Sequence, residues 1–240
     1  MAAGAGDTAA LSNYLEKDLI DVNLPDSDGD TALYWATCRR RTEAIKLLLE
    51  AGANPNQAGK SGSPLRVAAA LGARDLVSLL ISHGATIESD FAIGTPLNMA
   101  VKQSQEETVS LLLEHGADPN SRSTELLETP LMVAASLCNE NMIRMLLRAG
   151  ADARAEDRDG DTAIDYFALS GNINTPVAKL LLLNGGSIDR LYSRGYILMK
   201  QGSPTSLFQR WAVNDAALRD PDVELCFLPP QSSLREDFCV

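Results

Sequence analysis

Two histidines are the side chains most able to bind a metal in this sequence. His83 and His115 each stand directly before a glycine. A metal site needs several converging His or Cys ligands, and no cysteine lies in phase with these two. A residue just before the glycine that ends a helix instead interacts with the last carbonyl groups of that helix. We therefore expect no metal at the histidines.

Two pairs of aspartates suggest carboxylate chemistry or calcium binding. Asp28 and Asp30 flank one glycine, and Asp159 and Asp161 flank another. A calcium-binding loop closes with a glutamate at its twelfth position, and that spacing is absent. The aspartates are therefore predicted to be turn residues. Phosphate-binding loops, dinucleotide-binding turns and nucleophile elbows are also missing, so the sequence predicts a non-enzyme without cofactor or metal.

A short core motif recurs along the chain and defines the elements that position these side chains. It begins with Thr or Ser, continues with Pro or Ala, and ends with Leu or Ile. An apolar run that closes on glycine follows each core in the same register. The cores start at Thr31, Ser63, Thr95, Thr129 and Thr162, in steps of 32 to 34 residues. Two markers with one period indicate a repeat protein.

This pattern resembles the ankyrin repeat over about residues 7–189. The resemblance implies an all-α solenoid, in which each unit has a β-turn finger, an inner helix, an outer helix and a returning loop. The residue types fit that fold. Thr or Ser caps a helix, Pro suits its first turn, and Gly provides the left-handed residue that ends it.

The repeat register divides the chain into units. It gives a half-repeat cap at 1–26, full repeats near 27–58, 59–90, 91–124, 125–157 and 158–189, and a non-repeat tail at 190–240. Residues 1–6 are expected to be too short for an inner helix, so the first unit is predicted to contribute only an outer one. The ends of solenoids are atypical because they cap the stack.

One position departs from the family pattern throughout. The family usually has His as the fourth residue of its Thr-Pro-Leu-His signature, where it tethers the finger. Here the position holds Tyr34, Arg66, Asn98, Met132 and Asp165. The fingers are therefore predicted to be looser or differently held.

The net charge of −11 lies entirely in the repeats, because residues 190–240 carry six basic and six acidic side chains. Such a surface repels phosphates, which argues against nucleic acid and anionic membranes as partners. The four cysteines are scattered, and neither a signal peptide nor a membrane span is recognisable. We expect a cytoplasmic or nuclear protein.

The tail leaves three interpretations open: a cap on the last repeat, a SOCS box, and a partly disordered segment or lone ligand motif. It holds six of the twelve aromatic residues, so residues 191–200 are predicted to cap the last repeat and residues 206–218 to form a short helix. Alternatively, Ser206-Leu207 and Leu228-Pro229-Pro230 resemble a SOCS box. That resemblance implies a substrate receptor that recruits elongins B and C and a cullin-RING ubiquitin ligase. Trp211 and Asp215 stand where the box has Cys and an aliphatic residue.

The ankyrin resemblance implies a non-catalytic scaffold or adaptor that binds a protein partner on its concave face and fingertips. Two interpretations of the apolar tips of fingers three and four remain: they form an interaction patch, or they pack on one another. By register, the candidate binding residues are Asp28, Asp30, Arg39, Lys60, Phe91, Ile93, Lys102, Leu126, Leu127, Arg158 and Asp161.

Asn56 and Asn120 end their loops at the position that asparaginyl hydroxylases modify in some ankyrin proteins. Modification is one hypothesis for these asparagines. The other is that each side chain hydrogen-bonds the neighbouring turn.

Overall fold

The computed structural model describes residues 2–16, 21–60, 62–88, 94–170, 175–187, 190, 197–200 and 225–228. By its internal contacts the chain divides into two compact units, Met1–Glu125 and Leu126–Val240. Each unit is described by itself.

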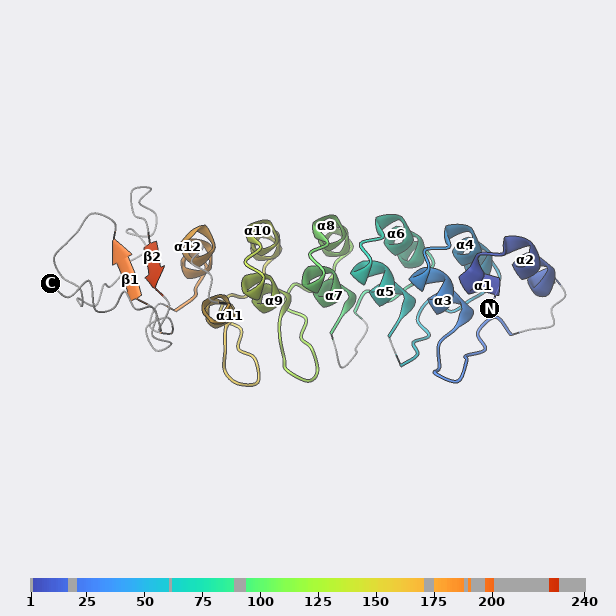
Figure 1. Cartoon of the computed structure of the whole chain (residues 1–240), viewed down its shortest axis with the longest axis horizontal. Helices are drawn as coiled ribbons and strands as arrows, with labels where there is room; N and C mark the ends of the chain where they lie inside the picture. Colours follow the sequence, from blue (N-terminus) through green and yellow to red (C-terminus); the bar gives the residue numbers. More distant parts are fainter. Residues whose placement is uncertain are drawn as a thin grey trace. The chain divides into compact units, whose positions relative to one another are not determined.

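The first unit is a double layer of short helices. The inner helices α1, α3, α5 and α7 pack side by side in chain order, and the outer helices lie over them (Figure 1). The helices are α1 (Ala2–Ala5), α2 (Thr8–Glu16), α3 (Ala32–Cys38), α4 (Thr42–Glu50), α5 (Pro64–Ala70), α6 (Arg74–Ser82), α7 (Pro96–Lys102) and α8 (Glu106–Glu114).

The second unit continues the same pattern with α9 (Pro130–Ser136), α10 (Glu140–Arg148), α11 (Ala163–Leu169) and α12 (Thr175–Leu183). Inner helix α9 packs against α11, and outer helix α10 packs against α12. The predicted all-α repeat fold is thus confirmed. Two short strands in the tail, β1 (Ile197–Lys200) and β2 (Leu225–Leu228), pair antiparallel, and no sequence pattern predicts them. The predicted helix at residues 206–218 lies outside the described residues.

The starts of the inner helices α3, α5, α7 and α9 follow the predicted capping chemistry. The hydroxyls of Thr31, Ser63, Thr95 and Thr129 each accept the backbone N–H three residues on, at 3.2–3.3 Å. Proline occupies the first turn of α5, α7 and α9, where its missing N–H costs nothing. These caps fix where the chain leaves each finger and enters its helix.

The core consists of small and branched apolar side chains at equivalent places in the repeats. The alanines near the middle of the inner helices are fully buried, which lets neighbouring helices approach closely. Each outer helix adds a buried leucine from the side that faces the inner layer. The members of this set are Leu33, Leu65, Leu97, Leu131 and Ile164, the alanine pairs Ala68-Ala69 and Ala134-Ala135, and Leu48, Leu80, Leu112 and Leu146.

The position that departs from the family signature is buried in all five repeats. In the fourth repeat, the backbone N–H of Thr129 donates to Met132 Sδ at 3.3 Å. In the fifth, Asp165 Oδ2 accepts both the N–H and the hydroxyl of Thr162, at 2.9 and 2.8 Å. In the second, burial lowers the pKa of Arg66. In the fourth and fifth repeats the finger base is therefore held by this side chain, which supports the prediction of differently held fingers there, whereas the buried amide of Asn98 in the third repeat has no hydrogen-bond partner.

The N-terminal cap contains an inner helix that was not expected. Residues 1–6 were considered too short for one, yet α1 forms a single turn at Ala2–Ala5, and Ala3 is buried where α1 packs against α3. Such a short helix is stabilised by its packing rather than by its own hydrogen bonds. Gly6, at φ 79°, then turns the chain into α2. The expectation of an outer helix alone is wrong for this unit.

The turn from inner to outer helix places one residue in the left-handed region in each described repeat. The residues are Arg40 (φ 53°), Gly72 (φ 66°), Ser104 (φ 55°) and Cys138 (φ 52°). Glycine adopts this conformation without steric cost, whereas residues with a Cβ pay about 1 kcal/mol or more.

We expect Ser104→Gly to raise the free energy of unfolding by about 0.5–1 kcal/mol, because it relieves this strain and breaks no described side-chain hydrogen bond. Urea unfolding followed by circular dichroism measures the change. The control is Ser110→Gly inside α8, where glycine should destabilise by a similar amount. A loss of stability in Ser104→Gly would show that the left-handed turn stores no strain.

Candidate protein-binding surface

Finger one, residues 26–30, is a rigid acidic turn. Asp26 Oδ1 accepts the backbone N–H groups of Asp28 and Asp30 at 2.9 and 3.0 Å. Asp26 Oδ2 accepts the indole N–H of Trp35 at 2.8 Å, and this hydrogen bond lowers the pKa of Asp26. At the tip, Asp28 pairs with Lys60 of finger two at 2.9 Å, and both side chains are exposed. The predicted turn role of the aspartates is borne out at this finger.

Asp30 lies at the base of finger one rather than on its surface. Its side chain is only 5% exposed, and its Oδ1 has no hydrogen-bond partner. A Cβ added at Gly59 would stand 1.8 Å from this oxygen, so finger two packs directly on the carboxylate. Burial, together with the charges of Asp26 and Asp28, raises the pKa of Asp30. The prediction that Asp30 is an exposed fingertip residue is therefore wrong, because its side chain is buried at the base of the finger.

Asp30 also lines an open groove between α1, α3 and the loop at residues 24–26. The groove has a volume of about 660 Å³ and is lined by residues 3–5 and 24–26 with Asp30, Ala32, Trp35 and Arg39. Trp35 is 40% exposed, and Leu24 is also exposed. The indole ring stands edge-on to Tyr34, with a centroid separation of 5.6 Å. A fixed aromatic surface is thus open to a ligand.

Finger five, residues 157–161, repeats the design of finger one. Asp157 Oδ1 accepts the backbone N–H groups of Asp159 and Asp161 at 2.9 and 2.8 Å, and Asp157 Oδ2 accepts the Tyr166 hydroxyl at 2.8 Å. The same hydroxyl lies 3.1 Å from Glu128, and burial raises the pKa of Tyr166. Asp161 is half-buried, and its backbone N–H is part of the turn.

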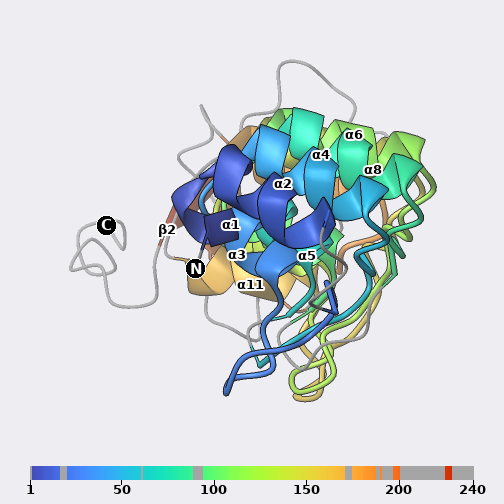
Figure 2. The same cartoon turned by 90° about the vertical axis from the view of Figure 1, so that its right-hand side faces the viewer.

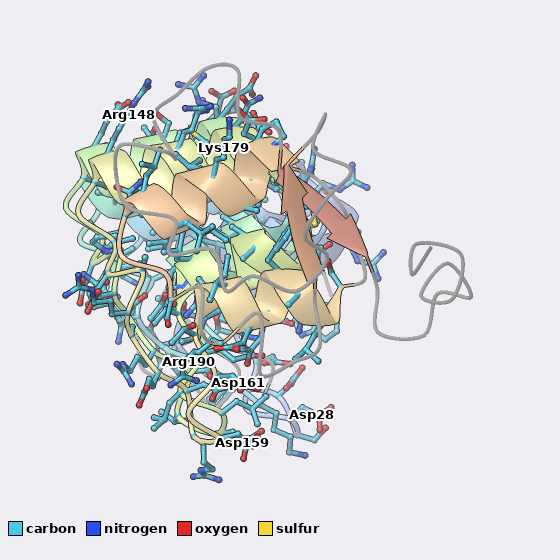
Figure 3. The ribbon with its side chains drawn as sticks, turned by 90° about the vertical axis from the view of Figure 1, so that its left-hand side faces the viewer. Asp28, Arg148, Asp159, Asp161, Lys179 and Arg190 are labelled. Atoms are coloured by element: carbon cyan, nitrogen blue, oxygen red, sulfur yellow. The ribbon has the colours of Figure 1, made fainter. Side chains whose placement is uncertain are left out.

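Arg190, the one described residue between positions 187 and 197, contacts finger five. It donates to the Gly160 carbonyl at 2.5 Å and lies 2.5 Å from Glu156 and 3.3 Å from buried Asp165. Figure 3 shows Arg190 beside Asp161 at the finger, whereas Arg148 and Lys179 lie on the outer helices. The tail therefore contacts the last repeat through a charged side chain that the sequence did not single out.

Finger four presents one of the predicted apolar tips to solvent. Leu126 is 49% exposed, and Leu127 is half-buried with φ 59°. The backbone of finger four is nevertheless tied to finger five, because the N–H of exposed Arg158 donates to the Leu126 carbonyl at 3.0 Å. Phe91 and Ile93 of finger three lie outside the described residues. The apolar patch therefore remains a prediction.

Two predicted contact residues lie at the ends of inner helices. Arg39 caps the C-terminus of α3 and Lys102 is the last residue of α7, and both are exposed. Neither residue belongs to the buried core of its helix. The first unit therefore has acidic groups at finger one and basic groups where its inner helices end.

The asparagines at the loop ends connect neighbouring repeats. Asn56 Nδ2 donates to the Gly84 carbonyl at 2.9 Å, and Asn56 Oδ1 accepts the N–H of Thr86 at 2.6 Å. Asn23 makes the equivalent pair of bonds with Gly52 and Asn54. This supports the hydrogen-bonding hypothesis for Asn56. Hydroxylation of Asn56 and Asn120 remains a separate prediction.

The histidines cap helices, as expected. His83 and His115 are the C-cap residues of α6 and α8, and His83 Nδ1 lies 2.9 Å from the Leu79 carbonyl. Among the described residues, no three His, Cys, Asp or Glu side chains gather closely enough to hold a metal ion. In the same part of the chain, no helix is long and apolar enough to cross a membrane.

Family models for ankyrin repeats match residues 1–59, 57–123 and 112–167. The chain belongs to the ankyrin repeat family. Ankyrin repeats generally serve protein–protein interaction and are not catalytic, so the inner helices and fingers are the surface to consider. Figure 2 shows the finger loops of the first unit projecting to one side of its helices.

One curated relative shares 39% identity over 59 residues, the palmitoyltransferase akr1 of Schizosaccharomyces pombe. The match covers 25% of this chain and 9% of the relative. This chain therefore spans less than a tenth of that protein's length, and the activity in its name belongs to that protein.

The ankyrin pattern did not reveal the groove or the residue that defines it. Trp35 and Tyr166 both stand four residues after the Thr that starts their helix, and both donate to the first aspartate of their finger. The sequence signal for such a finger is a Trp or Tyr nine residues after an aspartate, because the aromatic side chain donates a hydrogen bond to that carboxylate.

Proposed function

We propose that this ankyrin repeat protein is a non-catalytic scaffold or adaptor whose protein partner lies along its inner helices and fingertips, in the cytoplasm or nucleus. The open groove beside Trp35 carries the proposal, because an exposed aromatic ring held by a hydrogen bond is a typical anchor for a protein partner. In the second unit, taken by itself, the exposed Leu126 at the tip of finger four is a further apolar side chain open to a partner.

Site-specific photo-crosslinking tests this proposal. A photoreactive amino acid replaces Lys102 or Leu126 on the proposed face, or exposed Lys46 or Arg144 on the outer helices. We expect adducts with the same partner proteins from Lys102 and Leu126, and few from the outer helices. Equal labelling from both faces, or none from the inner face, would exclude the proposed surface.

The ligase-receptor alternative depends on the tail. Of the residues that resemble a SOCS box, only Leu228 is described, at the end of β2. No described contact favours this alternative. Absence of elongins B and C from the purified full-length complex would exclude it.

A further inference from the structure

Three consecutive arginines form the turn between α3 and α4, and we name them the arginine cluster. Arg39 caps the C-terminus of α3, Arg41 precedes α4, and Arg40 lies between them; all three side chains are exposed. The next three repeats have uncharged residues at this turn, which are Leu71-Gly72-Ala73, Gln103-Ser104-Gln105 and Leu137-Cys138-Asn139. The repeat fold therefore does not require arginine at this place.

The arginine cluster carries positive charge that the described part of the chain leaves unbalanced. None of its three guanidinium groups forms an ion pair with a described residue. Arg40 donates to the Leu71 carbonyl, which carries no net charge. In the first turn of α4, Glu43 is already paired with Lys46 at 2.9 Å. Exposed guanidinium groups in this situation suit the carboxylates of another molecule, which they bind in two-pronged geometry.

An apolar groove adjoins the arginine cluster. Arg39 lines this groove together with Trp35, which stands one helical turn earlier in α3. Leu24 and Pro25 also line it. Trp35 and Leu24 are exposed, and the indole is fixed by its hydrogen bond to Asp26. Because four residues of a helix span roughly 6 Å, an open aromatic ring and an open guanidinium lie close together on one face.

Asp26 determines which way a charged ligand lies in the groove. Its carboxylate is held at finger one by Trp35 and by the backbone of the turn, and it also lines the groove. A partner's carboxylate is therefore repelled at the finger and attracted at Arg39.

We propose that the groove and the arginine cluster bind an acidic partner segment, with one large apolar side chain against Trp35 and neighbouring carboxylates on the arginines. This inference rests on the proposed function and specifies the partner chemistry. The net charge of −11 on the whole chain does not oppose it. At physiological ionic strength the Debye length is about 8 Å, so distant exposed charges are largely screened and the arginine cluster dominates locally.

The test uses fluorescent seven-residue peptides in anisotropy titrations with the full chain. The first peptide has leucine at position two and glutamates at positions four and six, separated by serines, because alternate side chains of an extended chain lie about 7 Å apart on one face. The second replaces both glutamates with lysine, and the third replaces the leucine with serine. Each is also made in reverse order. We expect the wild-type chain to bind the first peptide, in one of its two orders, about tenfold or more tightly than the others.

Charge reversal in the protein supplies the sharper comparison. The doubly reversed variant, Arg39→Glu with Arg41→Glu, should weaken binding of the first peptide about tenfold and make the second peptide the tighter ligand. Arg148→Glu is the matched control, because it makes the same change at the exposed C-terminal end of α10 and should alter neither affinity.

Arg40→Gly separates binding from folding. Arg40 adopts a φ of 53°, which glycine adopts without steric cost, so this variant should keep the helical signal and the melting temperature of the wild type. It removes one charge of the arginine cluster and should weaken binding of the first peptide about threefold. Unchanged affinity in a normally folded variant would contradict the role of the cluster.

Equal affinity of all three peptides, no binding of the first in either order, or equal affinity of the doubly reversed variant and Arg148→Glu overturns the inference. So does a ten-nucleotide RNA that binds more tightly than the first peptide and loses affinity in the doubly reversed variant, because nucleic acid would then be the ligand. Sedimentation showing wild-type dimers that the doubly reversed variant dissociates overturns it as well, because the site would then take a second copy.

The photo-crosslinking experiment distinguishes failure of this inference from failure of the proposed function. If the peptides fail while crosslinks from Lys102 and Leu126 persist, only the partner chemistry is wrong. If those crosslinks are also lost, the proposed function is wrong.

Discussion

Phe167→Ala is expected to lower the free energy of unfolding by about 3–5 kcal/mol, the largest loss that we predict for a single substitution. Phe167 is fully buried in α11, which packs against α9 and α12. Truncation to alanine removes the transfer free energy of the ring and leaves a cavity that the short helices close only partly. Urea unfolding monitored by circular dichroism measures the loss.

The control for this prediction lies two residues away on the same helix. Leu169 is 60% exposed, so Leu169→Ala should change the free energy of unfolding by less than about 0.5 kcal/mol. Because repeat proteins are stabilised by neighbouring units, the Phe167→Ala variant should lose its C-terminal repeats first. Hydrogen exchange should therefore rise in α11 and α12 before it rises in α3 to α8. Similar losses in both variants would mean that α11 is not packed as described.

The repeat fold was predictable because its rules are local. A Thr or Ser cap, a Pro in the first turn and a closing Gly each act within a few residues, so their spacing alone locates the helices. The one-turn helix α1 was missed because its stability comes from packing against α3, which no local pattern records. The strand pair in the tail was missed for a similar reason, since its partners are distant in sequence.

The surface was less predictable than the fold, because exposure depends on contacts between units. Asp30 was expected on a fingertip, but Gly59 of the next finger packs over it. Trp35 was not among the candidate binding residues, although its indole N–H is bound to Asp26 and its ring remains exposed. Register gives the position of a residue in its repeat, whereas the neighbouring repeat decides which face of that residue is covered.

Fingers one and five have the same hydrogen-bonded turn but lie beside different basic side chains. In finger one, the buried carboxylate of Asp30 lies against Gly59 of finger two, and Lys60 pairs with the exposed Asp28. In finger five, Arg190 pairs with Glu156 before the finger and with buried Asp165 after it. A basic side chain of the protein therefore meets the tip of finger one, whereas in finger five it meets the residues that flank the finger.

The network around Asp165 supports the second large prediction. Asp165→Ala should lower the free energy of unfolding by about 2–4 kcal/mol, because it leaves two buried donors of Thr162 without an acceptor and removes a partner of Arg190. Arg190→Ala should cost about 1 kcal/mol, since that side chain is partly exposed and Asp165 keeps its bonds to Thr162. Thermal and urea unfolding measure both variants.

The double variant separates capping from charge pairing. If Asp165 acts mainly through Thr162, the double variant should be only slightly less stable than Asp165→Ala, with a coupling of about 0.5–1.5 kcal/mol between the two sites. Glu156→Ala is the control, because this exposed partner of Arg190 should contribute less than about 0.5 kcal/mol. An Asp165→Ala variant as stable as Glu156→Ala would show that the carboxylate does not cap α11. The departure from the family's usual histidine would then have no structural role at this repeat.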